Sequence, residues 1–370
     1  MKTKQLHVGQ LNVPDRKAVM RSFEGIFDRR FFTNHGPLVA EFEERIARRL
    51  GVKHAICVTN GTVALMVAME VAGLSGKVVV PAFTFPATVQ AITYAGLQPV
   101  FCDVDSRYHC ITAETVRVAM EDGCSAILGV RMWGRGAGID ALSSLAQENG
   151  LELMLDSAHA FGCVQGGVPV GSTGLFEVFS FHATKVLNCT EGGCVTTNDD
   201  NLAAAIRTSS NFHDRAGDVS VPLRINAKMS EAQAAMGLLG LERLDEIIEG
   251  NRHRYNLYRR LLSEIPGIRF FDHAEDIASN YQYVVIEVQD SFPLSQHDLM
   301  RNLKSQGIFA RRYFFPGMHE APPYNLKKWS LPVTDDLCCR VLQLPSGEVV
   351  SDADIEWVCR SIADVSQTRT

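Results

Sequence analysis

The feature that most constrains the fold is the regular alternation of helical segments and short apolar strands between residues 36 and 195. Apolar side chains recur at helical spacing over residues 37–50, and Gly51 ends that segment. Strands are expected over residues 54–58, 77–80, 100–104, 126–130, 151–155 and 178–181, with helices over residues 62–71 and 87–94. Such alternation is typical of a mostly parallel sheet that helices cover on both faces.

A smaller α+β unit is expected behind this region. Residues 230–262 carry apolar side chains at helical spacing, and Pro266-Gly267 ends the stretch. Two strands, over residues 283–288 and 308–313, are expected on either side of a helix over residues 296–306. Because 370 residues are too many for one small core, we predict two domains. The N-terminal arm and large domain span residues 1–245, and the small C-terminal domain spans residues 246–370.

Composition and charge exclude several classes of protein. The net charge of −6 gives no electrostatic basis for nucleic-acid binding. The apolar runs are too short to cross a membrane, and residues 1–8 lack the apolar core of a signal peptide. The ten cysteines include no C-x-x-C spacing, so neither a zinc site nor a disulfide framework is expected. We therefore expect a cytoplasmic protein with no metal, no membrane contact and no nucleic-acid partner.

The first candidate for chemistry is Lys185, which follows an expected strand and shortly precedes Glu191-Gly192-Gly193. A single lysine is usually a solvated surface charge. This one lies close to a strand end, between hydroxyl side chains that can bind phosphate, and near a Gly-Gly pair. Such a position suits a lysine that forms a Schiff base, because that amine must be partly desolvated to be nucleophilic near neutral pH.

Asp156 is the second candidate, because it directly follows the apolar strand over residues 151–155. Ligand sites of α/β proteins gather at this carboxyl edge of the sheet, although an aspartate there is often only a helix N-cap. The functional interpretation is a carboxylate that keeps a pyridine nitrogen protonated, so that the ring acts as an electron sink. His159 follows one helical turn later and can face the same ligand, although an isolated histidine is more often structural.

Two further features precede these in the chain. Asn60-Gly61-Thr62 forms a strand-to-helix turn, where glycine allows a close approach and the helix N-terminus attracts anions, although it is not a P-loop sequence. Phe85 follows the next strand and is either a core residue or a shelf for a planar ligand. Phosphate turn, aromatic, acid and lysine occur in the order that an enzyme dependent on pyridoxal 5′-phosphate (PLP) with the aspartate aminotransferase fold requires.

Nearly the whole chain resembles the DegT/DnrJ/StrS family of PLP-dependent nucleotide-sugar aminotransferases. The segments that carry the resemblance are residues 33–37, 41–43, 59–65, 81–88, 133–135, 156–162, 180–185, 191–193, 226–237, 312–316, 319 and 344–346. The resemblance implies the type I PLP-dependent transferase fold, which is the aspartate aminotransferase fold. It also implies a mostly parallel sheet in the large domain and a smaller α+β domain at the C-terminus.

The resemblance implies roles for four residues around the cofactor ring. Lys185 would carry the cofactor covalently and later move protons at the substrate carbon. Asp156 would pair with the pyridine nitrogen, and His159, where many relatives carry glutamine, would contact the ring hydroxyl. Phe85 would stack on the ring.

The resemblance also implies how the cofactor phosphate is held. Gly61, Thr62 and Ser180 would bind it from one subunit. Asn226 of the neighbouring subunit would complete the phosphate site, so the family pattern implies an obligate homodimer with two shared active sites.

The implied reaction is a ping-pong transfer in deoxysugar biosynthesis. An amino acid, expected to be glutamate, would convert PLP to pyridoxamine 5′-phosphate, and a nucleotide-linked keto sugar would then accept the amine. Residues 130–135 and 311–315 are most similar to enzymes that aminate C4 of dTDP-4-keto-6-deoxyglucose. Tyr313 and His319 are expected near the nucleotide sugar.

Four places in the chain depart from the family pattern, and the first is Gln10-Leu11, where Arg-Pro is common. Arg131 stands where relatives usually carry histidine, Lys228 where they usually carry arginine, and His213 where they usually carry glycine. A lysine cannot offer the bidentate fork of arginine, and Arg131 adds a fixed positive charge. These departures leave the sugar and its pose open.

Several alternatives share the fold. A sugar dehydratase would replace the Schiff-base lysine with histidine, and a non-catalytic regulatory relative would have lost Lys185 or Asp156; both residues are present. A sugar 3-aminotransferase remains an alternative. An amino-acid transaminase or decarboxylase would need an arginine for the substrate carboxylate, a role open to Arg312 or Arg131.

Overall fold

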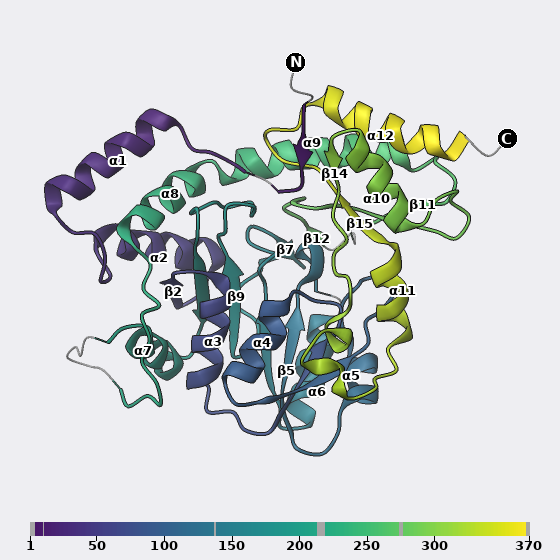
Figure 1. Cartoon of the computed structure of the whole chain (residues 1–370). Helices are drawn as coiled ribbons and strands as arrows, with labels where there is room; N and C mark the ends of the chain where they lie inside the picture. The colour runs from purple at the N-terminus through teal and green to yellow at the C-terminus, as the bar shows by residue number, and fades with distance from the viewer. Residues whose placement is uncertain (1–3, 10, 137, 213–218, 274–276, 368–370) are drawn as a thin grey trace.

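A seven-stranded sheet forms the centre of the computed structural model, which describes residues 4–9, 11–136, 138–212, 219–273 and 277–367 (Figure 1). Its strand order is β2-β10-β9-β6-β5-β3-β4. The strands are β2 (His54–Val58), β3 (Lys77–Pro81), β4 (Gln98–Cys102), β5 (Cys124–Val130), β6 (Glu152–Asp156), β9 (Phe176–Ser180) and β10 (Gly193–Thr197). Only β10 runs antiparallel to its neighbours β2 and β9. The predicted mostly parallel sheet is therefore confirmed.

Helices cover both faces of this sheet, as predicted. They are α2 (Pro37–Leu50), α3 (Gly61–Val71), α4 (Pro86–Tyr94), α5 (Ala113–Ala119), α6 (Ile139–Glu148), α7 (Asp200–Ser209) and α8 (Glu231–Glu242). Val78 and Val80 on β3 pack in the cluster that contains residues of α3, α4 and α7. Val79 between them packs with residues of α5 and α6. Since successive strand residues face opposite ways, the sheet is buried on both sides.

The C-terminal part of the chain forms a second layer at one end of the large sheet (Figure 1). Its antiparallel strands are β11 (Ile268–Phe270), β13 (Val284–Val288) and β15 (Val341–Leu344), packed with α9 (Leu244–Leu262), α10 (Gln296–Ser305) and α12 (Asp352–Gln367). The N-terminal strand β1 (Leu6–His7) pairs with β14 (Ile308–Phe309) in this layer. The domain boundary at residue 245 stays a prediction.

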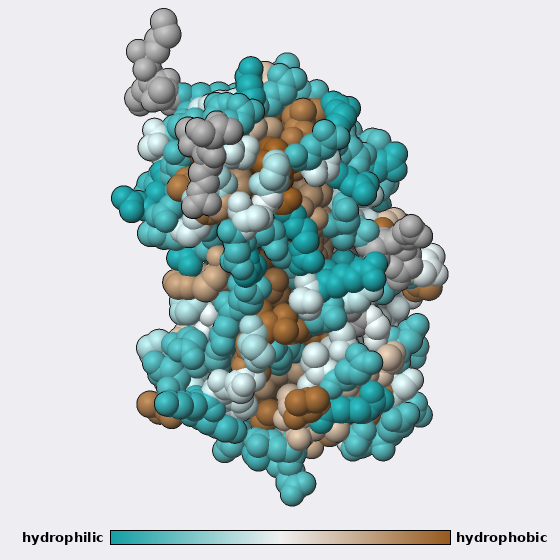
Figure 2. Space-filling view, turned by 90° about the vertical axis from the view of Figure 1, so that its right-hand side faces the viewer, coloured by the Kyte–Doolittle hydropathy of each residue, from teal (hydrophilic) through white to brown (hydrophobic). Residues whose placement is uncertain are grey.

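Two α-helices and three short strands of the described residues remain to be named. They are α1 (Arg16–Arg29), α11 (Pro332–Arg340) and the short strands β7 (Val164–Gln165), β8 (Val168–Pro169) and β12 (Ile277–Ala278). None of the helices in the described part of the chain is long and apolar enough to cross a membrane. The face of the molecule in Figure 2 is mainly hydrophilic, with apolar residues in scattered groups.

Two predicted elements differ from the structure. Residues 230–262 form two helices, because the backbone of Arg243 leaves the helical region (φ −101°, ψ 0°) between α8 and α9. The expected strand over residues 308–313 is limited to Ile308–Phe309, and beyond it only Arg311 makes an isolated bridge, to Gln343. Apolar side chains continue at helical spacing across Arg243, so the pattern alone does not reveal the break between α8 and α9.

Candidate active site

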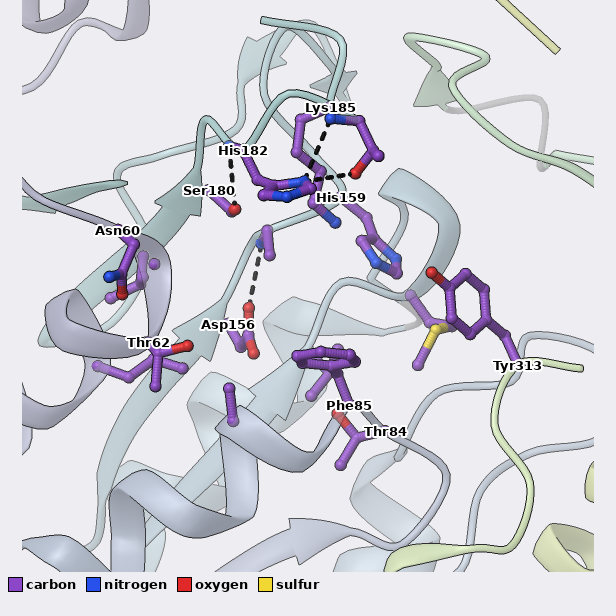
Figure 3. A pocket seen from close by; sticks show the side chains of 18 of the residues that line it. Asn60, Thr62, Thr84, Phe85, Asp156, His159, Ser180, His182, Lys185 and Tyr313 are labelled. Carbon is purple, nitrogen blue, oxygen red and sulfur yellow. Dashed lines mark hydrogen bonds between the residues drawn. The ribbon is translucent and has the colours of Figure 1, made fainter. Parts of the chain in front are cut away.

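A cavity of about 550 Å³ lies at the carboxyl ends of the parallel strands (Figure 3). Loops that follow β3, β5, β6 and β9 contribute to its lining, as do the first turn of α3 and residues 311–314. The predicted site residues that line it are Gly61, Thr62, Phe85, Asp156, His159, Ser180, Lys185 and Tyr313. Parallel strands bring their carboxyl ends to one edge, so residues far apart in the sequence meet there.

The first turn of α3 is shaped for a close approach. Asn60 is the N-cap, and its side-chain oxygen accepts a 2.9 Å hydrogen bond from the backbone N–H of Val63. A Cβ atom on Gly61 would lie 3.0 Å from Cβ of Ser180, so a larger residue would push α3 away from the end of β9. The free N–H groups and dipole of this helix N-terminus favour an anion beside Gly61 and Ser180.

Asp156 is the last residue of β6 and is held from two sides. Its Oδ2 accepts a 2.7 Å hydrogen bond from Oγ1 of Thr88, and its Oδ1 accepts one of 3.1 Å from the backbone N–H of Ala158. Oγ1 of Thr84 lies 2.9 Å from Oγ1 of Thr88. Burial raises the pKa of Asp156, and the hydrogen bond from Thr88 opposes that rise. A buried carboxylate of this kind favours a cationic partner.

Lys185 follows β9 and extends its amine into the cavity. Nζ donates a 2.9 Å hydrogen bond to Oη of Tyr283. Burial lowers the pKa of Lys185 from 10.5 to about 8, and the nearby carboxylate of Asp156 opposes this effect. With that pKa, roughly a tenth of the amine is neutral at pH 7, which is the form that attacks a carbonyl group.

His159 is buried in an aromatic group beside the cavity. Its ring stacks on Trp133 with centroids 5.7 Å apart and lies 4.3 Å from the ring of Tyr283. The backbone N–H of Trp133 donates to Nδ1 of His159 at 3.4 Å, so the proton of the neutral ring is on Nε2. Burial lowers the pKa of His159 well below its ordinary value, and the ring is neutral at pH 7.

Phe85 is not a core residue. Its side chain is 53 % exposed, lines the cavity and meets the ring of Phe314 at 6.3 Å in an edge-on arrangement. This exposure rules out the core interpretation and leaves a ring that a planar ligand can cover. Stacking on the cofactor stays a prediction.

Two predicted residues lie outside this cavity. Asn226 is exposed, and its Oδ1 accepts a 2.6 Å hydrogen bond from Nζ of Lys228. His319 is buried, with Nε2 3.0 Å from Oδ1 of Asp335. The predicted contact of Asn226 with a neighbouring subunit and that of His319 with the sugar stay predictions. His213 lies outside the described residues.

Arg131 and Arg312, the two arginines considered for a substrate carboxylate, do not line the cavity. Arg131 is buried with its Nε 3.0 Å from Oε2 of Glu177, and its Nη1 donates to Oε1 of Gln165 at 2.8 Å. Arg312 lies over the ring of Phe315. Both guanidinium groups are therefore engaged within the fold.

Three residues of the site were not identified from the sequence. Arg311 lines the cavity, and its Nη1 donates a 3.0 Å hydrogen bond to Oη of Tyr313. Thr88 and Tyr283 hold Asp156 and Lys185. Thr88 lies in the first turn of α4, and Thr84, in the loop before that helix, contacts its hydroxyl. No local pattern connects Tyr283 to a lysine 98 residues earlier.

The family follows from comparison with known proteins. The model of the DegT/DnrJ/EryC1/StrS aminotransferase family matches residues 15–363. The chain belongs to this family. A relative from Shigella dysenteriae, named dTDP-4-amino-4,6-dideoxy-D-glucose transaminase, is 32 % identical over 365 residues, which cover 98 % of this chain and 99 % of the relative. A GDP-perosamine synthase from Vibrio cholerae is 31 % identical and covers 90 % of this chain and 92 % of its own length.

A solved structure shares the fold. The crystal structure of DesI in the presence of its TDP-sugar product superposes with a TM-score of 0.94 at 41 % identity, over 98 % of this chain and 93 % of DesI. The predicted type I PLP-dependent transferase fold is confirmed, and so is the prediction that the chain is an aminotransferase.

Proposed function

We propose that this aminotransferase moves an amino group from an amino acid, expected to be glutamate, to C4 of a nucleotide-linked 4-keto-6-deoxy sugar. The observation that carries the proposal is the desolvated amine of Lys185 in the same cavity as the buried carboxylate of Asp156. The sugar follows from the relatives, since the name of the Shigella enzyme describes a sugar that carries its amine on C4. On this basis dTDP-4-keto-6-deoxyglucose is the first substrate to test.

We further propose that PLP is the cofactor, because the cavity offers a fitting group for each part of it. The N-terminus of α3 and Ser180 would hold the phosphate, and Asp156 would face the pyridine nitrogen. Phe85 would cover one face of the ring, and Lys185 would bind the aldehyde carbon. When bound, PLP supplies an electron sink that stabilises negative charge on the substrate carbon.

Asp156 and Lys185 have different roles in the proposed reaction. The hydrogen bonds from Thr88 and Ala158 fix both carboxylate oxygens of Asp156, so the carboxylate would pair with a protonated pyridine nitrogen without reorganising. Nζ of Lys185 takes a proton from the carbon of the amino donor and returns a proton to the carbon of the sugar. Its pKa of about 8 suits both directions, because a general acid–base group works best with a pKa near the operating pH.

The active form is proposed to be a homodimer with shared sites. The exposed Asn226 of one subunit would then contact the phosphate of the cofactor bound by the other subunit. The apolar side chains of Phe27 and Phe32 are 65 % and 49 % exposed, as expected of a surface that a second subunit covers. Mixing inactive Lys185→Ala and Asn226→Ala chains should restore activity, because hybrid dimers regain one complete site. A mixture without activity would contradict shared sites. Cytoplasmic localisation stays a prediction.

The substrate is tested by measuring amine transfer from glutamate to a panel of 3-keto and 4-keto sugars linked to dTDP or GDP. We expect a preference for a 4-keto sugar, and a preference for a 3-keto sugar would overturn the C4 assignment. Absorbance tests the chemistry independently. The purified protein should show a visible band that shifts on addition of glutamate, and Lys185→Ala should lack this response; a wild-type protein without it would contradict the proposal.

A further inference from the structure

The amine of Lys185 meets a hydroxyl group that comes from the C-terminal layer of the molecule. Tyr283 directly precedes β13, and its Oη accepts the 2.9 Å hydrogen bond from Nζ. The nitrogen lies 5.7 Å from the centre of the same ring. Lys185, in the loop after β9, and Tyr283, directly before β13, therefore meet at the wall of the cavity.

Hydrogen bonds to two loops of the site fix the backbone that carries Tyr283. Nδ2 of Asn280 donates to the carbonyl oxygens of His159 and Phe161, at 3.0 Å each. Oε1 of Gln282 accepts a 2.7 Å hydrogen bond from the backbone N–H of Val186, the residue after Lys185. Residues 280–283 are thus bound both to the loop that follows Asp156 and to the loop that carries the lysine.

The ring of Tyr283 is held as firmly as its backbone. It is 6 % exposed and packs against His159 at 4.3 Å and against Trp133 at 5.3 Å between ring centroids. Burial raises the pKa of Tyr283 well above its ordinary value. The hydroxyl is therefore neutral at every pH at which the enzyme is expected to work, and its oxygen has a fixed position.

A fixed acceptor matters because the lysine side chain is flexible. Four side-chain carbons separate the amine of Lys185 from its backbone. A lysine side chain whose amine is free samples many rotamers. During a transfer cycle the amine must lie close to the reacting carbon whenever it is not bonded to the cofactor. Proton transfer is fast only when donor and acceptor are within hydrogen-bonding reach.

We infer that Tyr283 is a positioning residue of the transfer reaction, whose hydroxyl holds Nζ of Lys185 at the cavity whenever the amine is free. The inference deepens the proposed function and rests on it. Lys185 takes up and returns the proton at the substrate carbon, while Tyr283 neither gains nor loses a proton. The contribution of Tyr283 is to keep the amine in the orientation that both proton transfers require.

Tyr283→Phe tests this inference, because it removes the hydroxyl and keeps the ring that packs on His159 and Trp133. Tyr258→Phe is the matched control: Tyr258 is also buried, but its hydroxyl donates to the carbonyl of Pro345 in the core of the C-terminal layer. Thermal unfolding of both variants would show whether each keeps its fold.

The first readout uses the cofactor-free protein, so it does not depend on turnover. Acetic anhydride acetylates neutral amines, and peptide mass spectrometry across a pH series gives the midpoint at which Lys185 titrates. Loss of the acceptor removes a partner of the charged amine, so the midpoint in Tyr283→Phe should fall by about 0.5 to 1 pH unit. Tyr258→Phe should match the wild type. An unchanged midpoint in Tyr283→Phe would overturn the inference.

The second readout is a single turnover with L-glutamate and with glutamate deuterated at Cα. In Tyr283→Phe the rate should fall about 10- to 100-fold, and the isotope effect should rise because proton transfer becomes the slowest step. An unchanged maximal rate, with only the half-saturating glutamate concentration altered, would contradict a positioning role. If the wild type aminates no keto sugar, the proposed function fails, whereas the acetylation series still decides whether Tyr283 holds Lys185.

Discussion

Replacement of Lys185 by methionine should make the cofactor-free protein more stable at neutral pH. The charged amine is buried, and burial lowers its pKa from 10.5 to about 8. The native state therefore loses the lysine proton at a lower pH than the unfolded state does. Below pH 8 both states carry the proton, and the native state bears the full free-energy cost of the buried charge.

The size of this cost follows from the displaced pKa. At about 1.4 kcal/mol per pH unit, the shift corresponds to roughly 3 kcal/mol. Methionine retains the apolar stem of the side chain, and loss of the hydrogen bond to Tyr283 costs about 1 kcal/mol. Lys185→Met should thus raise the free energy of unfolding by about 2 kcal/mol near pH 7. The gain should shrink as pH rises from 8 towards 10.5, where the unfolded state also loses the proton.

Urea unfolding of the cofactor-free proteins, followed by circular dichroism at about pH 7 and about pH 10, measures this difference. Lys53→Met is the control, since Lys53 lies on the surface with its side chain 60 % exposed, and its effect should not change with pH in the same way. A Lys185→Met protein that is less stable than wild type at pH 7, or whose advantage is the same at both pH values, would refute the reasoning.

Three further substitutions test other parts of the site. Thr88→Val removes a hydrogen bond that opposes the effect of burial on Asp156, so the pKa of this carboxyl group should rise further. The acidic limb of the pH profile of kcat/KM should then move to higher pH, and an unmoved limb would contradict this. Arg131→Met leaves Glu177 buried without its cationic partner and should lower the free energy of unfolding by about 3 to 5 kcal/mol in urea titrations, whereas a neutral effect would show that the pair is dispensable. Arg311→Gln removes a positive charge from the cavity wall and should raise KM for an anionic substrate about tenfold, with a smaller change in kcat. Steady-state kinetics with each substrate would show which substrate Arg311 contacts.

Much of the site could be predicted because its residues occupy ends of regular elements. Asp156 directly follows an apolar strand, and Gly61 opens a helix after another, so a parallel sheet necessarily brings them to one edge. The order of these motifs along the chain therefore carried information about their arrangement in space. Lys185 joined the same cavity for the same reason.

The contacts that tune the site could not be predicted in this way. Tyr283 reaches Lys185 only because the C-terminal layer packs against the large sheet, and Arg131 turns away from the cavity because a buried glutamate lies on the opposite face of β9. Neither contact has a local sequence pattern. The break between α8 and α9 at Arg243 was missed because apolar spacing continues across it.

The most direct test of the account is to find the lysine that carries the cofactor. The purified protein would be saturated with PLP, reduced with borohydride, digested and analysed by peptide mass spectrometry. The account predicts a phosphopyridoxyl group on Lys185 and its absence from the Lys185→Ala protein. A label on another lysine, or an unmodified Lys185, would contradict the assignment of this cavity as the active site.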